Sequence, residues 1–285
     1  MIKAYYNLTK PGIIYGNLLT TIGGLMLASG GRIVWPVFIG ALIGISLVVG
    51  SACVLNNLAD QKIDAKMART QNRALVTGAV SKTNAIIYAL VLLILGSIAL
   101  ANHANNLAWA VALTGFVIYV FIYTPLKPRS VYATLVGSIA GAVPPVVGYV
   151  AVSNKLDLGA WLLGLILILW QMPHFYSIAI FRLEDYEAAD IPVLPAKKGI
   201  NFTKINILGF IVVFILAISA LYFFHYAGLT YFLPMLAISL YWLFYGLKGS
   251  NIRTDHKAWA RKMFFISLFV ISLLPFSIIL DVLVK

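Results

Sequence analysis

The sequence predicts an all-α polytopic membrane protein. Hydrophobic residues make up 61% of its 285 residues, and the mean hydropathy is +0.94. A soluble protein of this length would need more polar residues to cover its surface. The apolar residues also fall in repeated runs of about 20, the length of helix that crosses the hydrocarbon core of a bilayer. An outer-membrane barrel is not favoured, because its strands would alternate polar and apolar residues over about ten positions.

Nine apolar runs are predicted to be transmembrane helices. They are 12–29, 35–59, 83–101, 106–126, 131–152, 159–181, 205–226, 229–248 and 262–284. The first run carries Asn17 and lacks a small-residue cleavage site, so we interpret it as a retained span rather than a signal peptide. In the fifth, Gly137 and Gly141 have a spacing that favours close helix packing, and Pro144 must kink the helix. No soluble segment is left over, so residues 1–285 are expected to form one integral-membrane domain.

Lysine and arginine are distributed unequally between the two predicted sides of the membrane. One side holds 18 of the 21, in the segment before the first run and in 60–82, 127–130, 182–204 and 248–262. The other side holds only Arg32, Lys155 and Lys285. Positive residues stay in the cytoplasm, so the N-terminus is predicted to be inside and the C-terminus outside. The same asymmetry accounts for most of the net charge of +12, which therefore does not indicate nucleic-acid binding.

Oxygen-bearing side chains recur every four residues at the end of the second run. Asn56, Asp60 and Asp64 would share one face if the second helix continues through them. Stacked carboxylates repel one another unless a positive charge lies between them, and Mg²⁺ favours such oxygen ligands together with water and phosphate. Arg69 and Arg73 follow and could contact phosphate oxygens. The alternative is an ordinary solvated helix end.

A second acidic segment follows the sixth run, on the same predicted side. Its acids are Glu184, Asp185, Glu187 and Asp190. Arg182 precedes them, and Lys197 and Lys198 follow. Two facing acidic clusters could hold Mg²⁺ around a diphosphate, and the bases would help to neutralise it. The C–O bond of a prenyl diphosphate could then break, because the leaving group is stabilised where its charge develops.

Several longer motifs carry a resemblance to a known family. They are TKPGIIYGNLL, NNLADQKID, RTQNRALVTG, YTPLKPRS, GAVPPVVGY, WQMPHFYSIAIFRLEDY and ADIPVLP, which are spread over nearly the whole chain. With these motifs the sequence resembles the UbiA superfamily of intramembrane prenyltransferases, whose first signature, N-x-x-x-D-x-x-x-D, is matched by Asn56, Asp60 and Asp64. The segments WQMPHF and DIPVLP narrow the resemblance to the branch that farnesylates haem.

The resemblance implies a UbiA-type fold of nine helices around a central cavity that opens to the cytoplasm, in the inner (plasma) membrane of a bacterium. It also implies that farnesyl diphosphate and haem B are the substrates. The farnesyl carbon would join a vinyl group of haem B, water would add to the resulting cation, and haem O and diphosphate would leave. Mg²⁺ is the implied cofactor, since haem B is consumed. Besides membrane lipid, a haem A synthase or a terminal oxidase is a candidate contact.

In one respect the sequence departs from that superfamily. Many members carry a second D-x-x-x-D after the sixth helix, whereas Asp185 and Asp190 are five residues apart and Arg182 comes early in the segment. We therefore predict Asp185 as the second-site metal ligand.

Further polar residues are predicted to bind the diphosphate or the haem propionates. In addition to the bases named above, they are Lys10, Asn17, Lys127 and Arg129. For the basic residues the alternative is simple positive-inside anchoring.

Aromatic and imidazole side chains inside the spans complete the set of candidates. Tyr119 and Tyr123 lie four residues apart, so their ring faces could stabilise an allylic cation; ordinary interfacial aromatics are the alternative. His174 lies with Gln171 and Pro173 in the sixth run, where polar groups are costly. It could ligate haem iron, orient the acceptor, or hydrogen-bond a backbone group that the proline frees.

Two other functions stay open at this point. Another prenyltransferase of the superfamily would share the diphosphate site but use a quinone precursor or a different lipophilic acceptor. A secondary transporter would also have broken helices and polar residues at the middle of the membrane, although transport does not explain why acids gather at one face with Arg and Lys. The sequence has no P-loop or dinucleotide fingerprint, so ATP-driven transport and redox-cofactor binding are not favoured.

Overall fold

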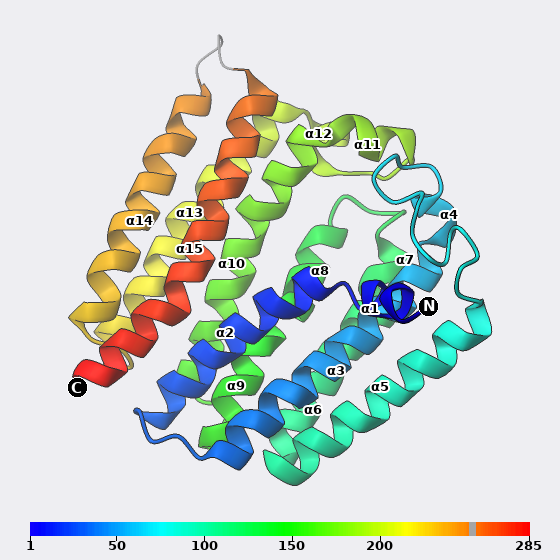
Figure 1. The fold of residues 1–285 in the computed structure, drawn as a ribbon. Helices are drawn as coiled ribbons and strands as arrows, with labels where there is room; N and C mark the ends of the chain where they lie inside the picture. Colours follow the sequence, from blue (N-terminus) through cyan, green and yellow to red (C-terminus); the bar gives the residue numbers. More distant parts are fainter. Residues whose placement is uncertain (251–254) are drawn as a thin grey trace.

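Helices form most of the described part of the chain, residues 1–250 and 255–285, in the computed structural model (Figure 1). Within these residues nine stretches are long and apolar enough to cross a membrane, which confirms the predicted number. They are α2 (Pro11–Ser29), α3 (Trp35–Ala59), α5 (Lys82–His103), α6 to α7 (Asn106–Leu126), α8 with α9 (Ala133–Ser153), α10 (Leu158–Phe181), α13 (Ile200–Phe223), α14 (Leu229–Leu247) and α15 (His256–Val284).

The ends of two helices differ most from the expected positions. Helix α13 begins at Ile200 and α15 at His256, both earlier than hydropathy predicts. The first turns of α15 carry basic residues, so an apolar pattern does not detect them. Their helical conformation is stabilised by Asp255, whose side chain accepts hydrogen bonds from the amides of Lys257 and Ala258.

Two of the spans are interrupted. The fourth consists of α6 (Asn106–Val117), the π-helix η1 (Ile118–Tyr123) and α7 (Thr124–Leu126). The fifth divides at Ala142 into α8 (Ala133–Gly141) and α9 (Val143–Ser153), as Pro144 and Pro145 predict, because proline has no amide hydrogen to continue a helix. Shorter helices lie between the spans or at the N-terminus: α1 (Ile2–Leu8), α4 (Gln61–Asp64), α11 (Leu183–Ala188), α12 (Leu194–Lys198) and η2 (Lys248–Ser250).

The spans pack in pairs, with α3 along α5, α2 along α9, and α10 against both α13 and α15. Figure 1 shows α13 to α15 on one side of the bundle and α3, α5 and α6 on the other. Helices α2 and α9 touch through their backbones: a Cβ on Gly24 would collide with the carbonyl oxygen of Pro145. Gly137 and Gly141 of α8 allow close packing of the kind expected, because a Cβ on either would clash with a side chain of a neighbouring helix, Tyr123 of η1 or Gln171 of α10.

The segments after the second and sixth spans lie together at one end of the bundle, where Figure 1 shows α4, α11 and α12. Met67, Ala189 and Ile191 form a small buried apolar cluster between them. The Nζ atom of Lys66 also lies 3.0 Å from Oδ2 of Asp190. Segments more than 100 residues apart are therefore fixed against each other at this end. Arg253, one of the cations counted on the inside, lies outside the described residues.

Candidate active site

Helical hydrogen bonding continues past the end of α3 and through α4. The amide of Asp60 donates to the carbonyl of Asn56 at 2.9 Å, and the amide of Asp64 donates to the carbonyl of Asp60 at 2.8 Å. The side chains of Asn56, Asp60 and Asp64, here called the acidic row, therefore lie on one helical face. Each of the three residues is only 2% exposed. This burial contradicts the alternative of a solvated helix end.

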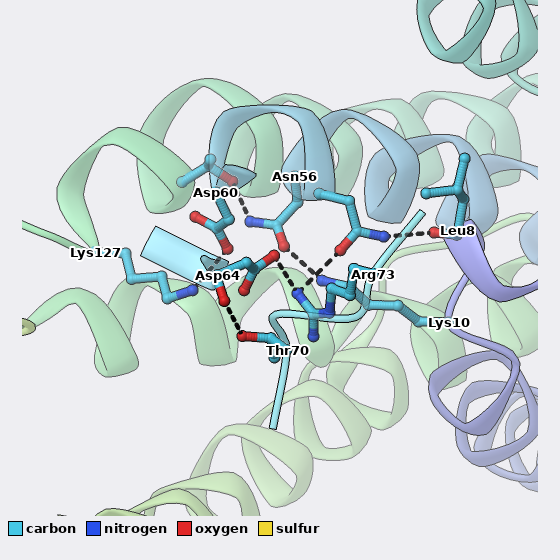
Figure 2. Close-up of polar contacts among 10 residues, drawn as sticks. Leu8, Lys10, Asn56, Asp60, Asp64, Thr70, Arg73 and Lys127 are labelled. Carbon is cyan, nitrogen blue, oxygen red and sulfur yellow. Dashed lines mark hydrogen bonds and ion pairs between the residues drawn. The ribbon is translucent and has the colours of Figure 1, made fainter. Parts of the chain in front are cut away.

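Each member of the acidic row has a cation beside it (Figure 2). The pairs are Lys10 Nζ with Asn56 Oδ1, Lys127 Nζ with Asp60 Oδ2, and Arg73 Nη1 with Asp64 Oδ2, each at 2.6 Å. Lys10 lies at the start of α2, Arg73 in the segment after α4, and Lys127 at the end of the fourth span. A buried carboxylate without a partner costs several kcal/mol, about 3 or more, so these pairs are what allows the acidic row to be buried.

Lys10 occupies an unusual position on the chain. It lies between α1 and α2 with a left-handed backbone (φ 54°), which is uncommon for a residue other than glycine. Removal from water lowers the pKa of its ammonium group to about 8. Strained residues of this kind cluster at functional sites, and a poorly hydrated ammonium group gains most from an anionic ligand.

Asn57 is a functional candidate that the sequence reasoning missed. Its Nδ2 donates to the carbonyl of Leu8 at 2.8 Å, and its Oδ1 accepts from Nη1 of Arg73 at 3.1 Å. One buried amide thus connects the end of α1, just before Lys10, to the cation that pairs with Asp64. The doublet Asn56-Asn57 in an otherwise apolar helix was the available signal, because an amide there must find partners.

The acidic row has oxygen atoms left over for a metal ion. Asp60 and Asp64 form their ion pairs through Oδ2, and within the described residues the Oδ1 atom of each makes no hydrogen bond. Carboxylate and amide oxygens suit Mg²⁺, which usually keeps several waters and shares its shell with substrate phosphate. Nowhere in the described ranges do three or more His, Cys, Asp or Glu side chains gather closely enough to hold a metal. The two carboxylates and the amide therefore fit an ion whose coordination shell is completed by water and by the substrate.

The second acidic segment is arranged differently. Asp185 pairs with Arg182 at 3.6 Å on α11, and Glu184 pairs with Lys257 at 3.4 Å. No hydrogen bond or ion pair of the described residues joins Asp185 to the acidic row. In this structure the partner of Asp185 is thus Arg182 rather than a member of the acidic row.

The remaining predicted substrate-binding residues lie outside the acidic row as well. Arg69, Arg129, Lys197 and Lys198 are exposed, and no hydrogen bond or ion pair of the described chain ties them to Asn56, Asp60 or Asp64. Asn17 is half-buried on α2, and its backbone carbonyl accepts from the hydroxyls of Thr20 and Thr21.

Tyr119 and Tyr123 lie on the π-helix η1, in the same span as Lys127. Their ring centroids are 5.1 Å apart, with an angle of 32° between the ring planes. Tyr123 packs against Gly137 of α8. The two rings form one aromatic surface on the span that supplies the cation beside Asp60.

His174 lies on α10, and its side chain faces α15. Its ring stacks on Trp170 at 4.7 Å, and its Nδ1 lies 2.7 Å from the hydroxyl of Ser267. That hydroxyl donates its only hydrogen to the carbonyl of Phe264, so it can only accept from His174. Nδ1 therefore carries the proton, and Nε2 carries the lone pair. The ring bonds a side chain of α15, which does not support a bond to a backbone group freed by Pro173.

The chain is similar to known proteins over its full length. Residues 17–269 match the UbiA prenyltransferase family. A protohaem IX farnesyltransferase of Protochlamydia amoebophila is 50% identical over 281 residues, covering 99% of both chains. A solved structure of a digeranylgeranylglyceryl phosphate synthase has a TM-score of 0.80 at 18% identity, covering 100% of this chain and 99% of that one. A UbiA homologue from Archaeoglobus fulgidus, bound to DMAPP and Mg²⁺, has a TM-score of 0.73 at 16% identity, covering 96% and 98%.

The pairing of Lys127 with Asp60 leads to a prediction about stability. Lys127→Met should lower the unfolding temperature in detergent, because it leaves the Asp60 carboxylate buried without a cation, at a cost of about 3 kcal/mol. Adding Asp60→Asn should recover part of the loss, because the amide carries no charge. Lys62→Met, at an exposed position without an ion pair in the described chain, is the control and should change little. A double variant no more stable than Lys127→Met would contradict this pairing.

Proposed function

The chain belongs to the UbiA prenyltransferase family, and on that premise we propose that it transfers the farnesyl group of farnesyl diphosphate to a vinyl group of haem B. Its activity is that of a protohaem IX farnesyltransferase, a prenyltransferase that makes haem O. The acidic row with its three cations is the observation that supports diphosphate chemistry. The choice of haem B as acceptor follows from the 50% identity to an enzyme of that name.

Asp60 and Asp64 are proposed to hold Mg²⁺ through the Oδ1 atoms that the ion pairs leave unused, and Asn56 through the Oδ1 atom that Lys10 would share or release. When bound, Mg²⁺ would neutralise the negative charge that develops on the diphosphate as it leaves. The three cations of the site would donate hydrogen bonds to phosphate oxygens; they are Lys10, Arg73 and Lys127. These cations already lie beside the acidic row, so they would need only to exchange or share a partner when the substrate arrives.

The reaction breaks the C–O bond of farnesyl diphosphate, the π bond of the vinyl group and one O–H bond of water, and it forms one C–C bond and one C–O bond. The C–O bond of farnesyl diphosphate breaks with its electrons passing to diphosphate, and the ring faces of Tyr119 and Tyr123 stabilise the allylic cation. A vinyl carbon of haem B attacks the farnesyl carbon, and the new cation on the haem side captures water and loses a proton. The surrounding apolar helices exclude other water, so that the allylic cation is not hydrolysed first.

His174 is proposed to bind haem B. Its Nε2 lone pair could ligate the iron or orient the ring, while Ser267 and the stack on Trp170 fix the imidazole. Fixing the tautomer through the other ring nitrogen is the usual way in which proteins prepare a histidine ligand. Asn17 and the exposed bases Arg69, Arg129, Arg182, Lys197 and Lys198 are proposed to contact the diphosphate or the propionates once substrates are bound. Asp185 remains our proposed second-site ligand, and it would have to leave Arg182.

The protein is an integral membrane protein with nine candidate spans in the described residues. We propose that residues 1–285 form one domain of the bacterial inner membrane, with the N-terminus in the cytoplasm and a haem A synthase or a terminal oxidase as neighbour. The excess of Lys and Arg on one side supports this orientation.

The proposed orientation can be tested with fusions. Alkaline phosphatase fused after Lys285 should be active outside, whereas the same fusion within 66–80 should be inactive. The opposite pattern would reverse the topology.

The role of His174 gives a second prediction. His174→Ala should weaken haem B binding about tenfold, a loss of about 1.4 kcal/mol, and leave farnesyl diphosphate binding nearly unchanged. Spectroscopic titration of haem and calorimetry of farnesyl diphosphate measure the two affinities separately. His103→Ala, at an exposed position, is the control. Equal haem affinity in His174→Ala and the wild type would rule out the ligand role.

The reaction itself is tested with purified protein, haem B, farnesyl diphosphate and Mg²⁺, with products identified by mass spectrometry. Haem O should form only when Mg²⁺ is present, and Asp60→Asn should reduce the rate about 100-fold or more, because it replaces a negatively charged metal ligand with a neutral amide. A prenylated quinone precursor without a haem product would keep the diphosphate chemistry and change the acceptor. If a folded protein used neither acceptor, the transporter alternative would have to be reconsidered.

A further inference from the structure

The fourth span leaves α-helical geometry just before it reaches the acidic row. Residues Ile118–Tyr123 form η1, and the amide of Thr124 donates to the carbonyl of Tyr119, five residues earlier. Single π-helical turns are rare and are found frequently at functional sites. Thr124 is the first residue after this turn and is only 5% exposed. Its side chain is thus inside the protein, next to the segment that carries Lys127.

The Thr124 hydroxyl joins this span to the acidic row. Its Oγ1 donates to the carbonyl of Tyr119 at 2.8 Å and accepts from Nδ2 of Asn56 at 3.1 Å. A hydroxyl has one hydrogen, and here it is committed to Tyr119. Only acceptor lone pairs then face Asn56, so Thr124 can bind the NH₂ end of that amide but not its oxygen.

This selectivity decides which way the Asn56 amide points. With Nδ2 on Thr124, Oδ1 is turned to Lys10, whose ammonium group can only donate. In the proposed reaction Lys10 also serves the diphosphate, and its hold on Asn56 then weakens. Thr124 is the partner that remains to stop the amide from rotating and presenting its NH₂ group to the cation.

We propose that Thr124 is a positioning residue for the Mg²⁺ site: its hydroxyl keeps Oδ1 of Asn56 directed to the metal. This role rests on the proposed function. Thr124 itself would touch neither the metal nor the substrate. Partners that orient a metal ligand in this way typically change metal affinity by about 10- to 100-fold when they are removed.

The test compares variants that differ in one hydroxyl. Thr124→Val keeps the shape of the side chain and removes the hydroxyl, while Thr124→Ser retains it. Thr114→Val is the matched control, because Thr114 lies on α6 and, within the described residues, its hydroxyl bonds only to the carbonyl of Ala110 in its own helix. Two quantities are measured: the Mg²⁺ dependence of inorganic diphosphate binding by calorimetry, and the Mg²⁺ concentration that gives half-maximal turnover.

Thr124→Val should need about tenfold more Mg²⁺ in both measurements, while kcat at saturating Mg²⁺ stays close to that of the wild type. Thr124→Ser and Thr114→Val should behave like the wild type. Unchanged Mg²⁺ dependence in Thr124→Val, even with a lower unfolding temperature, would overturn the proposal and leave a structural role only. An equal defect in Thr124→Ser would also overturn it, because the hydroxyl is then not the cause. If Thr124→Val does not fold, Thr124→Ala gives the same comparison.

Diphosphate binding needs no haem, so the outcome can be separated from the choice of acceptor. A wild type that binds diphosphate with Mg²⁺ but does not convert haem B would contradict only the acceptor, and the comparison of the Thr124 variants would stand. A wild type without Mg²⁺-dependent diphosphate binding would overturn the metal site and the role of Thr124 together.

Discussion

The burial of two carboxylates, Asp60 and Asp64, is the constraint on which the polar architecture of this protein depends. A carboxylate removed from water must be paired with a cation or give up its charge. The cations come from distant parts of the chain, so the N-terminal segment, the loop after α4 and the fourth span must all converge on the end of α3. The left-handed backbone at Lys10 and the buried amide of Asn57 lie at the point of that convergence.

The same pairing indicates in what form the ligands are recognised. A metal ion alone would compete with Arg73 and Lys127 for the carboxylates, and diphosphate alone would bring its negative charge close to the acids. In the proposed site the complex of both would satisfy the charged groups together, because the acids would face the metal while the cations face phosphate oxygens. We therefore expect the site to bind the magnesium–diphosphate complex better than either component alone.

The sequence was sufficient for the features that depend on local pattern. Hydropathy located the nine spans, and the four-residue spacing placed Asn56, Asp60 and Asp64 on one face. It did not reveal the features that depend on distant partners. The bond between Thr124 and Asn56 and the π-helical turn before it arise from the packing of two spans, while Asp185 pairs with Arg182, the residue just before its helix. The basic first turns of α15 were missed because hydropathy averages over a window of residues.

The wide turn of η1 also limits how this segment can change during evolution. Each residue of an α-helix rotates the chain by about 100°, so gaining one residue between Ile118 and Tyr123, with no second π-helical turn to absorb it, would turn everything downstream by roughly that angle. Thr124 and Lys127 would then face away from α3, although their identities were unchanged. Substitutions within η1 are therefore far easier to accommodate than an insertion, whereas a deletion that restored α-helical hydrogen bonding would remove the wide turn itself.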